Sequence, residues 1–141
     1  MKSRIALSIL AVFPLTATTA QTAAEDRASA KDCAVMQAVV IERGGVRTLG
    51  LAPDSFGLDC EWVKRLGSPV VPREAPGLRN TFKRPSYLPD GLQASLEYWE
   101  YYTPAHWGTD RYPYMHSFNC TLMKDRADWH LVRCRVGASA N

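Results

Sequence analysis

The chain has 141 residues, with 17 Lys and Arg against 14 Asp and Glu, and a formal net charge of +3. This length fits one domain, and no apolar run after residue 20 reaches the roughly 18 to 20 residues that a membrane-spanning helix needs. So small a charge argues against nucleic acid or an anionic membrane as the partner, because such binding depends on a clear excess of Lys and Arg.

Residues 1–20 have the layout of a secretory signal peptide. Lys2 and Arg4 form a basic start, an apolar run follows, and small residues end the segment at Ala20. Cleavage there would leave 15 basic side chains against 14 acidic ones, a net charge of +1. We therefore expect a secreted or periplasmic protein, with a disordered mature N-terminus over 21–30 and a single globular domain over 31–141.

Four cysteines fall in the expected mature chain: Cys33, Cys60, Cys120 and Cys134. An even number of cysteines in an exported protein predicts two disulfides. A metal site with four thiolates usually has C-x2-C pairs, whereas the spacings here are 27, 60 and 14 residues. The spacings therefore favour disulfides, and three pairings remain possible at this point.

The first expected element lies over residues 33–43. Ser29 and Asp32 have the spacing of a capping box, and the apolar stretch that follows ends at Gly44 and Gly45. This pattern favours a helix. The β-branched residues at 39–41 also suit a strand, so both structures stay open for this segment.

The next segments differ in composition. A second helix is expected over about 54–66, where Phe56, Cys60 and Val63 would share one face. Five prolines then occur within residues 67–91, and they argue against a regular helix or a central strand. We expect this stretch to be an extended loop that wraps the domain.

Three segments rich in β-forming residues follow, at 92–102, 112–124 and 129–136, and turn residues separate them. They predict a three-stranded antiparallel meander, whose last loop would be the three residues 126–128. That loop would place Cys120 opposite Cys134, close enough for a disulfide, and Leu122 opposite Val132. The remaining two cysteines, Cys33 and Cys60, would then pair with each other.

The first two predicted strands meet across a loop at 103–111. This loop length places Leu96 opposite Phe118 and Tyr98 opposite His116. One face of the sheet then becomes apolar and the other polar, a separation that a one-residue slip would destroy. The expected apolar face comprises Leu92, Ala94, Leu96, Phe118, Cys120, Leu122, Val132, Cys134 and Val136.

An apolar sheet face needs a cover, and the N-terminal helices are the segments able to provide it. The predicted fold class is therefore α+β, with N-terminal helices packed on a C-terminal meander of three to four antiparallel strands and two disulfides. In layer geometry alone, this arrangement is similar to the cystatin-like and nuclear-transport-factor-like architectures. No sequence motif of either family accompanies the similarity.

The apolar face changes character toward the 103–111 loop. Beyond Leu96 and Phe118 the same register predicts three further pairs across the two strands: Tyr98–His116, Glu100–Tyr114 and Tyr102–Tyr112. The core would thus grade into a polar-aromatic end, which is a common place for a ligand pocket. In the loop itself, Trp107 is a candidate anchor for a partner, or else a cover for the sheet.

These patterns predict a small binding or interaction domain without a cofactor. Its ligand would be a small polar molecule or a glycan, or its partner a protein, and seven residues would form the contact region: Tyr98, Glu100, Tyr102, Trp107, Tyr112, Tyr114 and His116. An alternative is a small hydrolase or isomerase that uses Glu100 and His116 as an acid–base pair in a pocket between helices and sheet.

Two further interpretations concern the same residues. A structural role would have the tyrosines and a Glu–His contact merely close the end of the core, and a module that recognises its partner through Trp107 alone is also possible. The three histidines lack the spacing of zinc-binding motifs, so no metal is expected.

Overall fold

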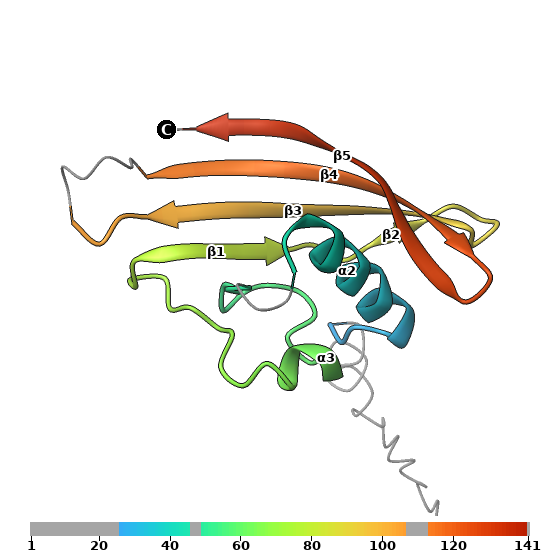
Figure 1. Ribbon diagram of the computed structural model, residues 1–141, viewed down its shortest axis with the longest axis horizontal. Coiled ribbons are helices and arrows are strands. Elements are labelled where there is room, and N and C mark those ends of the chain that lie inside the picture. Colours follow the sequence, from blue (N-terminus) through green and yellow to red (C-terminus); the bar gives the residue numbers. More distant parts are fainter. Residues whose placement is uncertain (1–25, 46–48, 107–112, 141) are drawn as a thin grey trace, which may run out of the picture.

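The computed structural model describes residues 26–45, 49–106 and 113–140. The predicted signal peptide, residues 21–25, Trp107 and Tyr112 lie outside the described residues. The described chain is an α+β fold in which one helix crosses one face of a five-stranded antiparallel sheet (Figure 1). The α+β class and the antiparallel sheet are as predicted.

The helices are α2 (Ala30–Arg43) and the single turn α3 (Glu61–Lys64). The strands are β1 (Gly77–Phe82), β2 (Ser86–Tyr87), β3 (Gln93–Thr103), β4 (Tyr114–Asp125) and β5 (Asp128–Ala140). The order across the sheet is β1-β3-β4-β5, and β2 also pairs with β3. No helix in the described part of the chain is long and apolar enough to cross a membrane.

Helix α2 begins with the capping box that the sequence predicts. The Ser29 side chain accepts a hydrogen bond from the backbone N–H of Asp32, and the Asp32 carboxylate accepts one from the backbone N–H of Ser29. The buried side chains of α2 include Val35, Met36 and Val39, a spacing typical of one helical face. The β-branched residues are tolerated in this helix because Val39 and Val40 face the core.

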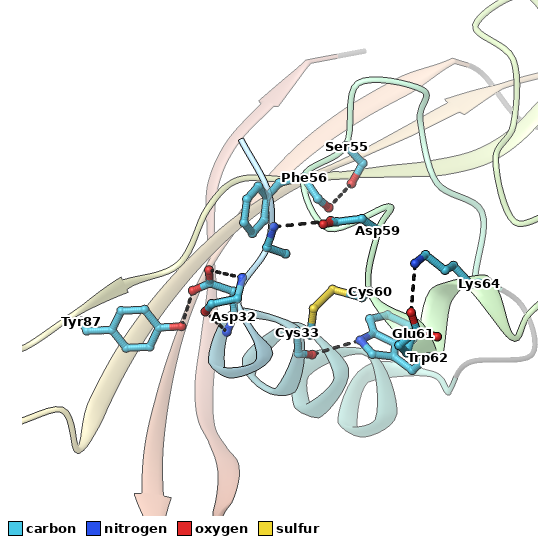
Figure 2. Close-up of a disulfide and its surroundings, with 12 residues drawn as sticks. Asp32, Cys33, Ser55, Phe56, Asp59, Cys60, Glu61, Trp62, Lys64 and Tyr87 are labelled. Carbon is cyan, nitrogen blue, oxygen red and sulfur yellow. Dashed lines mark hydrogen bonds and ion pairs between the residues drawn. A yellow bond between two sulfur atoms is a disulfide. The ribbon is translucent and has the colours of Figure 1, made fainter. Parts of the chain in front are cut away.

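The predicted helix over 54–66 is wrong except for its last turn, α3. Gly57 has a φ of +81°, in the left-handed region, so the chain turns there instead of continuing as a helix. A Cβ atom at this position would also collide with the side chain of Met36. The segment before α3 is fixed instead by the Cys33–Cys60 disulfide, and the indole of Trp62 donates a hydrogen bond to the carbonyl of Cys33 (Figure 2).

The prediction of an uninterrupted loop over 67–91 is also wrong, because this segment contains β1 and β2. The five prolines all lie outside the two strands, because proline has no backbone N–H to donate to a neighbouring strand. The proline-free interval 77–84 is long enough for a strand, and β1 pairs with β3 over its whole length. On the other side of β1, Leu51 forms isolated parallel bridges with Asn80 and with Val70.

The last two strands pair as predicted around the second disulfide. Cys120 lies opposite Cys134, and the two sulfurs are bonded. The predicted pairing of Leu122 with Val132 is wrong, since a bulge places Leu122 opposite Leu131 and leaves the Val132 side chain 57% exposed. The connecting turn is also one residue shorter than expected, because Asp125 pairs with Asp128. Two disulfides are compatible with an extracellular protein.

The register between β3 and β4 differs from the predicted one by two residues. Leu96 lies opposite Cys120, Tyr98 opposite Phe118, and Glu100 opposite His116. Side chains alternate with a period of two, so this shift keeps every residue on its predicted face. Of the expected apolar face, Ala94, Leu96, Cys120 and Leu122 are buried, whereas Leu92, Val132 and Val136 are exposed.

A polar contact fastens the start of α2 to β2. The Tyr87 hydroxyl donates a 2.6 Å hydrogen bond to the carboxylate of Asp32, which is buried (Figure 2). Burial by itself would raise the pKa of Asp32, but hydrogen bonds from Tyr87 and Ser29, together with the charge of Arg84, hold this pKa below its ordinary value of 3.8. The contact therefore stabilises the fold only while the carboxylate is ionised.

Replacing Tyr87 by phenylalanine is expected to lower the free energy of unfolding by about 1.5–3 kcal/mol at pH 7, because a buried carboxylate loses a hydrogen bond. The folded-state pKa of Asp32 is depressed, so its stabilising contribution is present above the unfolded-state pKa and is lost as the pH falls through the folded-state pKa. The difference between the wild type and the variant should therefore narrow below about pH 4.

Urea unfolding at pH 7 and at pH 3 measures this difference. Tyr101→Phe is the matched control, because no carboxylate accepts a hydrogen bond from Tyr101 in the described part of the chain. A loss for Tyr87→Phe that is the same at both pH values would contradict the role given to Asp32.

Candidate functional site

Helix α2 covers only part of the sheet face on which it packs, which we call the inner face. Its 14 residues span about 21 Å, whereas the 12 residues of β4 span about 40 Å. Figure 1 shows that the ends of β3 and β4 next to their connection extend beyond the helix. Inner-face side chains at these strand ends therefore have no described helix above them.

A row of aromatic rings marks the boundary between the covered and the uncovered part. The ring of Tyr98 stacks between those of Phe82 and Phe118, with centroid distances of 5.1 Å and 5.0 Å. Arg43, the last residue of α2, places its guanidinium 4.4 Å from the centroid of Phe118 and 5.8 Å from that of Tyr98. The end of the helix is thus held against this row by cation–π contacts.

Beyond this row lie Glu100, Tyr102, Tyr114 and His116, which we call the open end of the inner face. All four side chains are partly exposed. The ring of Tyr114 stacks on that of Tyr102 at a centroid distance of 5.4 Å and makes a tilted contact with the ring of His116 at 4.8 Å. Its hydroxyl donates a 3.3 Å hydrogen bond to the carboxylate of Glu100. Tyr114 therefore connects the two strands and links the carboxylate to the imidazole.

Glu100 and His116 lie directly opposite each other, yet each has another partner. Glu100 accepts a hydrogen bond from Tyr114, while Nδ1 of His116 lies 2.8 Å from the hydroxyl of Ser139. Among the described residues, the carboxylate and the imidazole form neither a hydrogen bond nor an ion pair with each other. The carboxylate and the imidazole are instead connected through Tyr114, which contacts both of them.

A pocket of about 130 Å³ adjoins the open end, and we call it the inner pocket. Val39 and Val40 of α2 give it an apolar wall, and Asn80 and Tyr98 contribute polar groups from β1 and β3. Arg43 and Glu100 also line the pocket without forming an ion pair with each other in the described structure. The pocket therefore offers one charge of each sign beside an apolar surface.

Both of these charges act on the pKa of the Tyr98 hydroxyl, in opposite directions. Burial raises the pKa of Tyr98 to about 12, the charge of Glu100 adds to this effect, and Arg43 opposes it. At neutral pH the hydroxyl is therefore protonated, so it can both donate and accept a hydrogen bond.

The structure brings five of the seven predicted contact residues to the inner face: Tyr98, Glu100, Tyr102, Tyr114 and His116. Trp107 and Tyr112 lie outside the described residues. Trp99 and Tyr101, which belong to the same aromatic-rich stretch, alternate onto the opposite, outer face, where their rings stack on each other. Strand alternation alone separates these two residues from the site.

Two polar side chains of the inner pocket, those of Arg43 and Asn80, were not predicted from the sequence. Arg43 was not considered because a basic residue in the last turn of a helix has an ordinary role there, favourable interaction with the helix dipole. Asn80 was missed because strand β1 was not predicted. Its side-chain amide donates a hydrogen bond to the carbonyl of Gly50, which holds the residue at the pocket.

Among the described residues, no group of three or more His, Cys, Asp or Glu side chains is placed to share a metal ion. Comparison of the chain with protein-family models, with curated proteins and with solved structures finds no match.

Proposed function

We propose that this protein is a binding domain whose ligand is a small polar molecule held at the inner pocket and the open end of the inner face. One observation carries the proposal: Arg43 and Glu100 line the same pocket as oppositely charged groups that are not paired with each other. Charged groups beside an apolar wall are favourable when a ligand completes their interactions.

The size of the pocket limits the part of the ligand that enters it. Pockets that enclose a drug-sized molecule usually have volumes of about 300–1,000 Å³, and the inner pocket has about 130 Å³. A small apolar group of the ligand fits against Val39 and Val40, with its polar groups between Arg43 and Glu100. The remainder would extend over the partly exposed rings of Tyr102 and Tyr114.

Binding is favoured over catalysis because of the partners of Glu100 and His116. An acid–base pair needs both groups to reach the same reacting atoms with their protons free to move. Here Glu100 accepts a hydrogen bond from the Tyr114 hydroxyl, and Nδ1 of His116 is hydrogen-bonded to the Ser139 hydroxyl. Such a domain would meet its ligand outside the cytosol, where disulfides persist.

The experiment is a ligand panel followed by backbone amide NMR. Amino acids, monosaccharides and short peptides are added in turn to the 15N-labelled protein. We expect a hit to shift the amides of Gly45, Asn80 and Glu100. For that hit, Glu100→Gln should weaken binding about tenfold or more, because a charge-assisted hydrogen bond is lost.

The matched control is Glu97→Gln. Glu97 lies on the same strand, but on the outer face, where its carboxylate accepts a hydrogen bond from the indole of Trp99. Binding by this variant should stay within about twofold of the wild type. Equal affinity in wild type and Glu100→Gln, or shifts confined to the outer face, would overturn the proposed function.

A further inference from the structure

The outer face of the sheet holds a buried arginine that the proposed function does not use. Arg79 of β1 pairs with Tyr101 of β3 and is only 9% exposed. Arginine is almost never buried to this extent unless an acidic group pairs with it, because removing a charge from water is costly. The partners of Arg79 therefore need to be identified.

Both recorded acceptors of the Arg79 guanidinium are neutral. One terminal nitrogen donates a 2.6 Å hydrogen bond to the carbonyl of Pro72, and the other donates a 2.8 Å bond to the hydroxyl of Thr103. A guanidinium has five N–H donors, so these two bonds leave donors for another acceptor. The two contacts orient the side chain, but they do not balance its charge.

Within the residues that the structure describes, no carboxylate lies within ion-pair distance of Arg79. Asp54 is an acidic residue that lines the same space, but its carboxylate already binds Arg73 at 2.8 Å. With Arg73 and Arg79 against Asp54, the local charge stays positive. A buried cation without a counter-charge is a feature that a bound anion would explain.

Open space lies next to this cation. Arg79 and Tyr101 line two hollows on the outer face, with volumes of about 280 Å³ and about 320 Å³. Thr81 lines the first hollow together with Arg73, and both Thr81 and Tyr101 carry hydroxyl groups that can donate to an anion. We call this first hollow the Arg79 hollow.

We propose that the Arg79 hollow binds a small oxyanion, a carboxylate or a phosphate group, through the guanidinium of Arg79. The planar fork of a guanidinium matches two oxygens of either group, and burial strengthens the charge-assisted hydrogen bonds. Arg73 supplies a second positive charge at the solvent side of the hollow, where its side chain is exposed. This site lies on the opposite face of the sheet from the inner pocket and is independent of the proposed function.

The test is an NMR titration of the full 15N-labelled protein at pH 7 that follows the Nε–Hε signals of the arginine side chains. The probes are sodium acetate and sodium phosphate, compared with sodium chloride at equal ionic strength. We expect a saturable shift of the Arg79 signal and of the Thr81 and Tyr101 amides with at least one oxyanion, and no saturable shift with chloride. The acetate and phosphate arms decide which oxyanion is preferred.

Two variants show whether the guanidinium is responsible. Arg79→Lys keeps the charge and loses the fork, so oxyanion affinity should fall about tenfold or more. Arg135→Lys changes an exposed arginine of the same face and should leave the affinity within about twofold. Should Arg79→Lys fail to fold, the wild-type titration decides alone. The proposal would be overturned if the Nε–Hε signal of Arg79 shifted linearly with oxyanion concentration, or if its shift matched that of the Arg135 signal.

Discussion

Replacing Leu122 by alanine is expected to lower the free energy of unfolding by about 3–5 kcal/mol. Leu122 is 0% exposed and lies in the core between sheet and α2. Removing its isobutyl group costs the transfer free energy of the lost atoms and leaves a cavity that the surrounding chain fills only in part. Urea unfolding followed by far-ultraviolet circular dichroism measures the loss.

Met123→Ala is the matched control for this prediction. Met123 is the next residue on β4, points to the outer face and is 43% exposed. Its truncation should cost less than about 1 kcal/mol, as substitutions at exposed positions usually do. Equal losses for the two variants, or a larger loss for Met123→Ala, would show that the inner and outer faces of β4 are assigned wrongly.

Removing either disulfide is expected to destabilise the protein by about 3–4 kcal/mol, because each bridge restricts the unfolded chain. The cysteine pairs are separated by 27 residues for Cys33–Cys60 and by 14 residues for Cys120–Cys134. The longer closed segment should give the somewhat larger loss. Both cysteines of a bridge are replaced by alanine together, and thermal and urea unfolding compare the two double variants.

Thiol quantitation of the denatured wild type is the control, since all four cysteines are bonded in the structure. We expect no free thiol without a reducing agent. Each double variant should also show no free thiol, because its two remaining cysteines are bonded to each other. If the wild-type cysteines paired differently, the two remaining cysteines would have lost their partners and would react as free thiols. A loss below about 1 kcal/mol for both double variants, or free thiols in the wild type, would contradict the two bridges.

The sequence predicted those features of the fold that depend on neighbouring residues. The capping box at Ser29 and Asp32 marks the start of α2, and alternation assigns the faces of β3 and β4. Cys120 and Cys134 lie opposite each other as predicted, although the turn between β4 and β5 is one residue shorter than expected and the bulge beside Leu122 offsets this difference. In the capping box and in the strand alternation, a few residues decide the local geometry, with little influence from the rest of the chain.

The features that the sequence did not predict depend on contacts between distant segments. A register shift of two residues keeps all faces unchanged, so the polarity of β3 and β4 cannot distinguish the observed register from the predicted one. The bulge at Val132 and the turn at Gly57 depend on packing against neighbouring elements. Strand β1 was missed because the surrounding prolines indicated a loop.

The residues of the candidate site also fall into a group that the sequence predicted and a group that it did not. Its strand residues, among them Glu100 and His116, were predicted because they continue the alternation of the core toward the end of the sheet. The residues that make the inner pocket charged and polar, Arg43 and Asn80, come from α2 and β1. These two residues line the pocket because of where α2 ends above the sheet. The predicted strand lengths did not indicate that position.

The most direct test of the proposed binding site is the location of a bound ligand by intermolecular nuclear Overhauser effects. The compound selected from the panel is added to the wild-type protein, and contacts between ligand and protein protons are measured. We predict contacts with the side chains of Val40, Tyr98 and Asn80, which line the inner pocket. Contacts that lie only on the outer face, or elsewhere on the protein, would contradict the account.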